Sequence, residues 1–148
     1  MATTVTPTIL SVSITESYIL NGVEYGGTKT KTYTSSGKVL QRIMVAKTDD
    51  PAIINFGADD KLGQVIAADF QYFRVTNLDD TNFITLTLYN GADSFFYKLK
   101  AGDTLLLMDN EMDAIASSSS FGAFADITQI AADANDEECA VEFFAVTT

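Results

Sequence analysis

Apolar and polar residues alternate with a period of two over most of this chain, and this alternation limits the folds open to it. In residues 10–20 the even positions are Leu, Val, Ile, Glu, Tyr and Leu, while the odd positions are mainly Ser or Thr. Successive side chains of a β-strand point to opposite faces, so this pattern predicts a strand with one covered face.

A hairpin is expected directly after this strand. Asn21-Gly22 is the pair that most readily takes the positive φ values of a two-residue turn, and such a turn places Tyr18 opposite Tyr25. Gly26-Gly27 then fits a β-bulge. Thr and Lys alternate through residues 28–34, so the returning strand has one wholly polar face. That face suits a solvated edge or a surface that awaits a partner.

Further strands follow at spacings of about 8 to 14 residues, with turn residues at each break. They are expected at residues 39–46, 52–56, 69–76, 83–89, 94–100, 104–108, 124–131 and 138–146. One window, residues 109–118, has helical spacing but is too short for more than a turn or two. The pattern predicts an all-β protein: a single-domain antiparallel β-sandwich, jelly-roll-like, of about ten strands. We expect residues 1–8 to form an extended N-terminal arm and residues 9–148 to form the sandwich.

Length and composition fit one domain with a real core. The chain has 148 residues, of which 47% are hydrophobic, enough for one domain but not for two of typical size. No apolar run approaches the roughly 18 to 20 residues that cross a bilayer, and the polar start lacks the pattern of a signal peptide. Cys139 has no partner cysteine and apolar neighbours, so we expect a buried side chain and no disulfide.

The net charge of −11 is unevenly spread. Residues 1–48 hold five basic and two acidic residues, a balance of +3, whereas residues 49–148 hold four basic and eighteen acidic residues, a balance of −14. An acidic surface repels phosphate backbones and anionic lipids, so nucleic acid and membranes are poor partners. The two parts can attract each other or their counterparts in neighbouring subunits.

The residue content argues against an enzyme. The chain has no histidine, and a Ser or Cys nucleophile ordinarily needs one as its base. The acidic pairs at 49–50, 59–60 and 79–80 lie in expected turns, where Asp is favoured for backbone hydrogen bonding. Asp109, Glu111 and Asp113 could offer oxygen atoms to calcium, but the pattern of an EF-hand is missing. We therefore assign no catalytic, cofactor-binding or metal-binding residue.

Two segments carry a family resemblance. Residues 72–88 contain Arg-Val-Thr-Asn-Leu-Asp before a second strand, and residues 97–107 contain Lys-Leu-Lys-Ala-Gly-Asp at a hairpin. Together they resemble small β-sandwich structural proteins of tailed bacteriophages, over about a quarter of the chain. The resemblance implies a virion component assembled in the host cytoplasm, specifically a decoration or cement protein on the capsid lattice. Its expected partners are the major capsid protein or other virion subunits, and it is expected to form a homo-oligomer, with a trimer as one option.

The resemblance leaves the position in a particle open, so a tail, neck or fibre-associated subunit is an alternative. Phe96 lies between lysines on one strand face, and the polar start and the Thr-Lys strand can order against a neighbour. The expected subunit-interface residues are Thr3, Thr4, Val5, Thr6, Pro7, Lys29, Lys31 and Phe96.

A carbohydrate-binding module is the alternative from a different class. Sugars stack on exposed aromatic rings, which Tyr25, Tyr33 and Tyr89 could supply, although the chain has no Trp.

Overall fold

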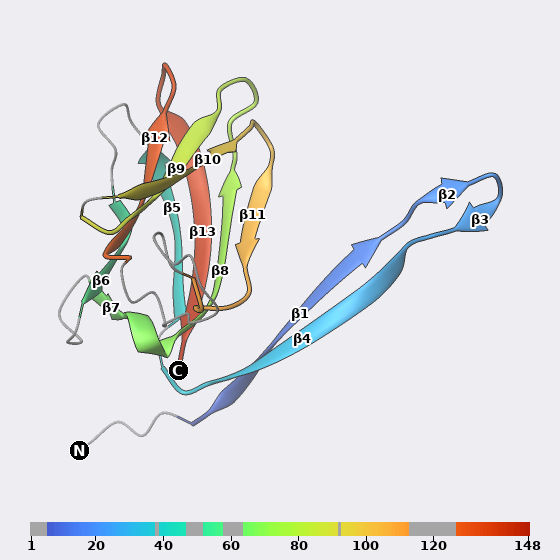
Figure 1. Cartoon of the computed structure of the whole chain (residues 1–148), viewed down its shortest axis with the longest axis horizontal. Helices are drawn as coiled ribbons and strands as arrows, with labels where there is room; N and C mark the ends of the chain where they lie inside the picture. The colour runs from blue at the N-terminus through green and yellow to red at the C-terminus, as the bar shows by residue number, and fades with distance from the viewer. Residues whose placement is uncertain (1–5, 38, 47–51, 58–63, 92, 113–126) are drawn as a thin grey trace.

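The chain folds into two packed β-sheets (Figure 1), as a computed structural model that describes residues 6–37, 39–46, 52–57, 64–91, 93–112 and 127–148 shows. One sheet has the order β10 (Ser94–Leu99), β9 (Ile84–Tyr89), β12 (Gln129–Ala134), β6 (Ala52–Gly57), β7 (Gln64–Ile66). The other has the order β11 (Thr104–Leu107), β8 (Phe70–Asn77), β13 (Cys139–Thr147), β5 (Val39–Ala46). Neighbouring strands are antiparallel except β6 and β7, which are parallel. The prediction of an all-β, antiparallel sandwich is confirmed.

The hydrophobic core lies between the two sheets. On β8, Phe73 and Val75 are fully buried, and on β9 the alternate residues Ile84 and Leu86 are fully buried as well. They belong to one cluster that also includes Val141 of β13. The period-two pattern of these strands therefore arises because one face of each strand enters the space between the sheets.

A long hairpin, residues 8–35, projects from the sandwich and joins neither large sheet (Figure 1). Its strands are β1 (Thr8–Glu16) and β4 (Gly27–Ser35), continued by β2 (Ile19–Leu20) and β3 (Val23–Glu24). At roughly 3.3 Å per residue, each half of this hairpin extends about 40 Å. The sequence predicts that the sandwich begins at residue 9, whereas this segment forms a separate ribbon. The expected pairing of Tyr18 with Tyr25 is present, as a backbone hydrogen bond of 2.8 Å.

The prediction of a β-bulge at Gly26-Gly27 is wrong. The pairing register is constant along the hairpin. Thr8 pairs with Ser35 at the base, Leu20 pairs with Val23 at the tip, and the strands between them have equal length, so no extra residue is inserted in either strand. Gly26 is needed for a different reason: a Cβ at this position would collide with the carbonyl group of Glu16.

Other differences are local. The strand β7 and the 3-10 turn η1 (Ala67–Asp69) are not expected from the sequence. In the window 109–118, residues 109–112 form no helix and the others lie outside the described residues. Within the described ranges, no helix has the length and apolar character needed to cross a membrane.

Candidate assembly surface on the long hairpin

The long hairpin has two chemically different faces. Directly paired residues of antiparallel strands lie on the same face, so the register assigns every side chain to one of them. One face, here called the apolar face, carries Leu10, Val12, Ile14, Tyr18, Leu20, Val23, Tyr25 and Tyr33, with the charged residues Glu16, Lys29 and Lys31 between the tip and the base. The opposite face consists mainly of Ser and Thr.

The Ser/Thr face bonds largely to itself. The hydroxyl oxygens of Ser13 and Thr30 lie 2.8 Å apart, and those of Thr15 and Thr28 lie 3.0 Å apart. These hydrogen bonds across the strands support the ribbon in water without help from a partner. The apolar face has no such means of stabilising itself, because its side chains gain only from removal of water.

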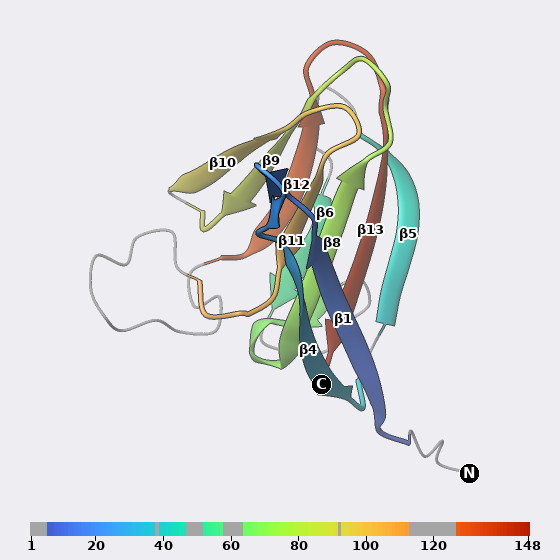
Figure 2. The same ribbon diagram turned by 90° about the vertical axis from the view of Figure 1, so that its right-hand side faces the viewer.

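The base of the hairpin is fixed to the sandwich through Tyr33. This side chain is only 8% exposed and packs with Tyr72 and Val146, while Leu10 and Val12 pack against the same cluster. The ring centroids of Tyr33 and Tyr72 lie 5.8 Å apart. Figure 2 shows β1 and β4 passing in front of the four-stranded sheet at this point. The apolar face of the hairpin base is therefore covered by the outer face of that sheet.

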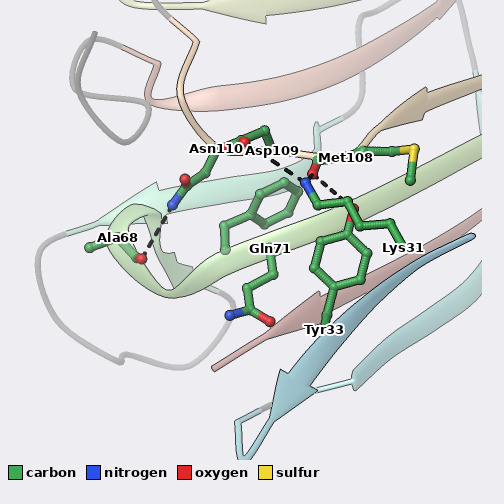
Figure 3. A pocket seen from close by; sticks show the side chains of 8 residues that line it. Lys31, Tyr33, Ala68, Gln71, Met108, Asp109 and Asn110 are labelled. Atoms are coloured by element: carbon green, nitrogen blue, oxygen red, sulfur yellow. Dashed lines mark hydrogen bonds and ion pairs between the residues drawn. The ribbon is translucent and has the colours of Figure 1, made fainter. Parts of the chain in front are cut away.

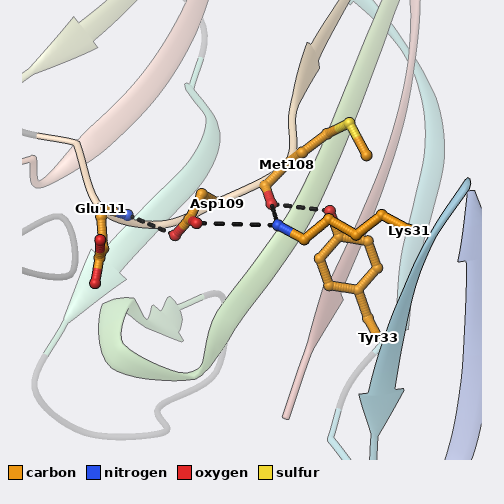
Figure 4. Close-up of polar contacts among 5 residues, drawn as sticks. All are labelled: Lys31, Tyr33, Met108, Asp109 and Glu111. Carbon is orange, nitrogen blue, oxygen red and sulfur yellow. Dashed lines mark hydrogen bonds and ion pairs between the residues drawn. The ribbon is translucent and has the colours of Figure 1, made fainter. Parts of the chain in front are cut away.

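Polar contacts converge on one carbonyl oxygen at the hairpin base (Figure 4). The Tyr33 hydroxyl and the Lys31 ammonium both donate hydrogen bonds to the carbonyl oxygen of Met108, over 2.8 Å and 2.7 Å. The Lys31 ammonium also lies 3.9 Å from the carboxylate of Asp109. These contacts tie β4 to the chain that follows β11, so they determine where the hairpin leaves the sandwich.

A shallow pocket beside this junction has a structural role (Figure 3). Two of its polar side chains contact protein: Lys31 donates to Met108, and the Asn110 amide donates to the carbonyl oxygens of Ala67 and Ala68, each over 3.3 Å. Asp109 accepts a hydrogen bond from the backbone N–H of Glu111 over 3.1 Å. The contacts of Lys31, Asp109 and Asn110 therefore hold the chain after β11 against the hairpin base and against η1.

The tip of the hairpin, residues 18–25, exposes large apolar side chains. Asn21 and Gly22 have φ values of 52° and 80°, which match the expected two-residue turn. Tyr18, Leu20, Val23 and Tyr25 lie on the apolar face and are 46–64% exposed. The rings of Tyr18 and Tyr25 lie 6.3 Å apart and stiffen the tip. A rigid, exposed cluster of this kind is typical of an interaction surface.

A carboxylate holds the tip to the rest of the hairpin. One oxygen of Glu24 accepts hydrogen bonds from the backbone N–H groups of Tyr18 (3.0 Å) and Gly26 (2.8 Å). The bond from Tyr18, followed by that from Gly26, holds the pKa of Glu24 below its ordinary value of 4.5. The charged form of Glu24 is therefore the form that stabilises the junction between tip and stem.

We expect this junction to loosen in acid. Because the pKa of Glu24 is lower in the folded hairpin, its stabilising effect is fully present above the ordinary pKa and is lost as pH falls through the lowered pKa. In an NMR titration, the carboxyl signal of Glu24 should move together with the amide signals of Tyr18 and Gly26. Glu24→Gln should change both amide signals at neutral pH. Titration of Glu24 at or above 4.5 would contradict this assignment.

The structure separates the residues expected at a subunit interface. Lys31 lies in the hairpin base. Lys29 is exposed and lies two residues nearer the hairpin tip on β4. Phe96 lies on β10, at the edge of the other sheet, and is exposed. Thr6 and Pro7 are exposed and precede β1, while Thr3, Thr4 and Val5 lie outside the described residues. Those of them that the structure describes therefore lie on separate parts of the molecule.

The apolar residues at the hairpin tip were not among the expected interface residues. The signal for them is in the alternation itself, since the apolar positions continue from Leu10 through Leu20 and resume at Val23 and Tyr25. A short ribbon cannot cover such a row on its own. The same alternation predicts a partner-binding surface once the hairpin is known to lie outside the sandwich.

The other candidate sites do not come together either. Of the tyrosines considered for sugar stacking, Tyr25 lies at the hairpin tip, Tyr33 is buried at its base, and Tyr89 ends β9. Among the residues that the structure describes, no group of three acidic or cysteine side chains is placed to hold a metal ion. Asp113, the third member of the candidate calcium triplet, lies outside them.

Comparison with known proteins gives no further guide. No family model matches the sequence, and no curated protein or solved structure matches the chain.

Proposed function

We propose that this chain is a non-enzymatic structural subunit of a phage particle, specifically a capsid decoration protein that binds neighbouring subunits through its long hairpin. The observation that carries the proposal is the exposed apolar tip on a hairpin that leaves the sandwich. A two-stranded ribbon is marginally stable in water unless its apolar face is covered. The tip therefore gains stability when another subunit covers it.

Charge supports an apolar contact at the tip. The hairpin carries Glu16 and Glu24 against Lys29 and Lys31, so it is formally neutral, and the net charge of −11 comes from the rest of the chain. A neutral projection approaches a partner without the repulsion that two acidic sandwiches would exert on each other. The acidic sandwich then keeps the unassembled protein soluble.

The virion setting rests on the resemblance of residues 72–88 and 97–107 to phage β-sandwich proteins. The major capsid protein is the first proposed partner, with other virion subunits as the alternative. A subunit of the tail, neck or fibre would use the same projecting hairpin, so the particle fraction to which the protein binds decides between these positions.

The test is to shorten the hairpin without disturbing its base. Val12 pairs with Lys31, so replacing residues 13–30 with Asn-Gly closes the ribbon in its native register. We expect this variant to fold with an unchanged sandwich but to lose cosedimentation with heads assembled without the protein. Separate tail fractions are assayed in parallel.

The control is Ile19→Thr, which removes an exposed apolar side chain from the opposite face of the full-length tip. It should bind particles as the unaltered protein does. Equal binding by the shortened variant would refute a role for the hairpin, and binding to tails alone would move the proposal to a tail subunit.

A further inference from the structure

The outer face of the four-stranded sheet is only partly covered by the hairpin base. Residues on this face pack with Tyr33, Leu10 and Val12; they are Tyr72, Leu106, Phe144 and Val146. Beyond them lies β5, the edge strand on the far side of β13 (Figure 2). The hairpin therefore covers part of this face and leaves β5 open.

The open part of this face carries exposed apolar side chains beside an ion pair, in which a guanidinium nitrogen of Arg74 lies 2.9 Å from a carboxylate oxygen of Glu142. In the register with β13, Val39 lies opposite Val146, Ile43 opposite Glu142, and Val45 opposite Ala140. Since Val146 packs under the hairpin base, these β5 residues point to the same outer face. Val39, Ile43 and Val45 are 46–65% exposed. We call these three side chains the β5 stripe.

The hairpin base already packs on the outer face of the four-stranded sheet. The hairpin tip and the β5 stripe extend the two sides of this contact, and both are uncovered. The apolar face of the hairpin packs on the outer sheet face at its base and stays open at its tip. The outer sheet face is covered over β8 and β13 and stays open over β5. Both open halves carry exposed apolar side chains, as the joined halves carry buried ones.

We infer that the β5 stripe binds the hairpin tip of a second copy of this chain. This inference rests on the proposed function and names one of the partners of the hairpin. The contact is made between two molecules because the tip lies at the far end of the ribbon from its own sandwich (Figure 1). The hairpin keeps one register from Thr8 to Val23, and the Glu24 carboxylate bridges the break between its two ladders, so the tip does not fold back onto the sheet that holds its base.

The tip has apolar area that such a contact would bury. An aromatic side chain covers about 150–250 Å², so two half-exposed tyrosines, Tyr18 and Tyr25, have roughly 200 Å² left to bury. An open edge strand with exposed apolar side chains is also an aggregation hazard, which a specific partner removes. Covering the β5 stripe with the tip solves both problems in one interface.

The contact joins two different surfaces, so it is heterologous. Each copy offers one tip and one β5 stripe, and repetition of the contact gives a closed ring or an open filament. A tip-to-tip contact, in contrast, would stop at a dimer. This difference makes the proposal testable by mixing variants.

Two variants each remove one half of the contact. Tyr18→Thr with Tyr25→Thr removes the tip, and Ile43→Thr with Val45→Thr removes the stripe; threonine keeps the strand preference in all four positions. Light scattering and sedimentation over a concentration series should show self-association of the unaltered protein. Each double variant should weaken that association at least tenfold.

The decisive sample is an equimolar mixture of the two double variants. One variant retains its stripe and the other retains its tip, so a single contact is possible and a one-to-one dimer is expected, with nothing larger. The matched control, Ile19→Thr on the other face of the tip, should associate normally. Phe96→Ser tests the interface that the sequence alone predicts: Phe96 is 65% exposed like Ile43 but lies on β10, and its loss should leave the association unchanged if the β5 stripe makes the contact.

The remaining outcomes overturn the inference. An unaltered protein that stays monomeric at millimolar concentration excludes the contact, and a stripe variant that associates normally points to tip-to-tip pairing. Loss of association in Phe96→Ser alone would transfer the contact to β10. Particle binding is measured separately, so a monomer that still binds heads through its hairpin refutes this inference but leaves the proposed function standing.

Discussion

Replacing Tyr33 with alanine is expected to release the long hairpin from the sandwich while the sandwich stays folded. The change removes a buried ring that packs on Tyr72 and a hydroxyl that donates to Met108. Truncation of a buried aromatic side chain costs about 3–5 kcal/mol. The cost falls on the hairpin base, because Tyr33 belongs to the small cluster outside the main core.

Hydrogen exchange separates the two parts of the molecule. In Tyr33→Ala, amide protection in the base of β1 and β4 should fall by about a hundredfold, as expected for roughly 3 kcal/mol of local stability. Amides of β8 and β13 next to the core residues Phe73 and Val141 should keep most of their protection. Particle binding should weaken too, because a loose hairpin must be ordered when it binds.

Tyr33→Phe is the matched control, since it removes the hydroxyl and keeps the ring. One neutral hydrogen bond contributes about 1 kcal/mol, so the hairpin should stay attached, and Lys31 still donates to the Met108 carbonyl. Unchanged protection of β1 and β4 in Tyr33→Ala would show that the hairpin is not held by this side chain.

Local patterns in the sequence predict most strands of the fold, but not where each strand packs. Period-two alternation indicates that one face of a strand is covered, and it is the same for β8, inside the sandwich, as for β1, in the projecting hairpin. The parallel pairing of β7 with β6 joins segments separated by undescribed residues and leaves no local signal. Strand boundaries agree closely where turn residues are clear, as at Asn21-Gly22.

The candidate site was predictable only in part. The Thr-Lys alternation of residues 28–34 suggested a surface that awaits a partner, yet the Thr residues face solvent on one side while Lys31, on the other side, is used at the hairpin base. The apolar tip was visible in the sequence as Tyr18, Leu20 and Tyr25. Its exposure depends on the hairpin leaving the sandwich, and this is a tertiary feature that alternation does not encode.

The segments that carry the phage resemblance include a buried structural residue, Asn77. This side chain is fully buried at the end of β8. Its amide group donates to the carbonyl oxygens of Asn82 (2.9 Å) and Leu99 (3.3 Å), and its side-chain oxygen accepts from the backbone N–H of Asp79 (3.1 Å). Asn77 therefore joins the turn after β8 to the end of β10.

Asn77→Leu is expected to destabilise the whole sandwich. Leucine has a similar volume but leaves the buried carbonyl oxygen of Leu99 and the partly buried carbonyl oxygen of Asn82 and N–H of Asp79 without their partner. Each unsatisfied buried group costs about 1–3 kcal/mol. We expect a loss of about 3–5 kcal/mol in the free energy of unfolding, measured by urea denaturation. For a domain of this size the same loss lowers the melting temperature by roughly 10 °C.

Asn135→Leu separates the loss of a turn hydrogen bond from the effect of burial. The Asn135 side-chain oxygen also accepts from a turn N–H, that of Phe83, over 2.9 Å, but Asn135 is exposed and water can replace it. The control should cost about 1 kcal/mol or less. Equal costs for the two variants would contradict the assigned role of Asn77. If Asn77→Leu is much the more costly, the Arg-Val-Thr-Asn-Leu-Asp pattern reflects the demands of the fold, and partner binding must be sought on the hairpin.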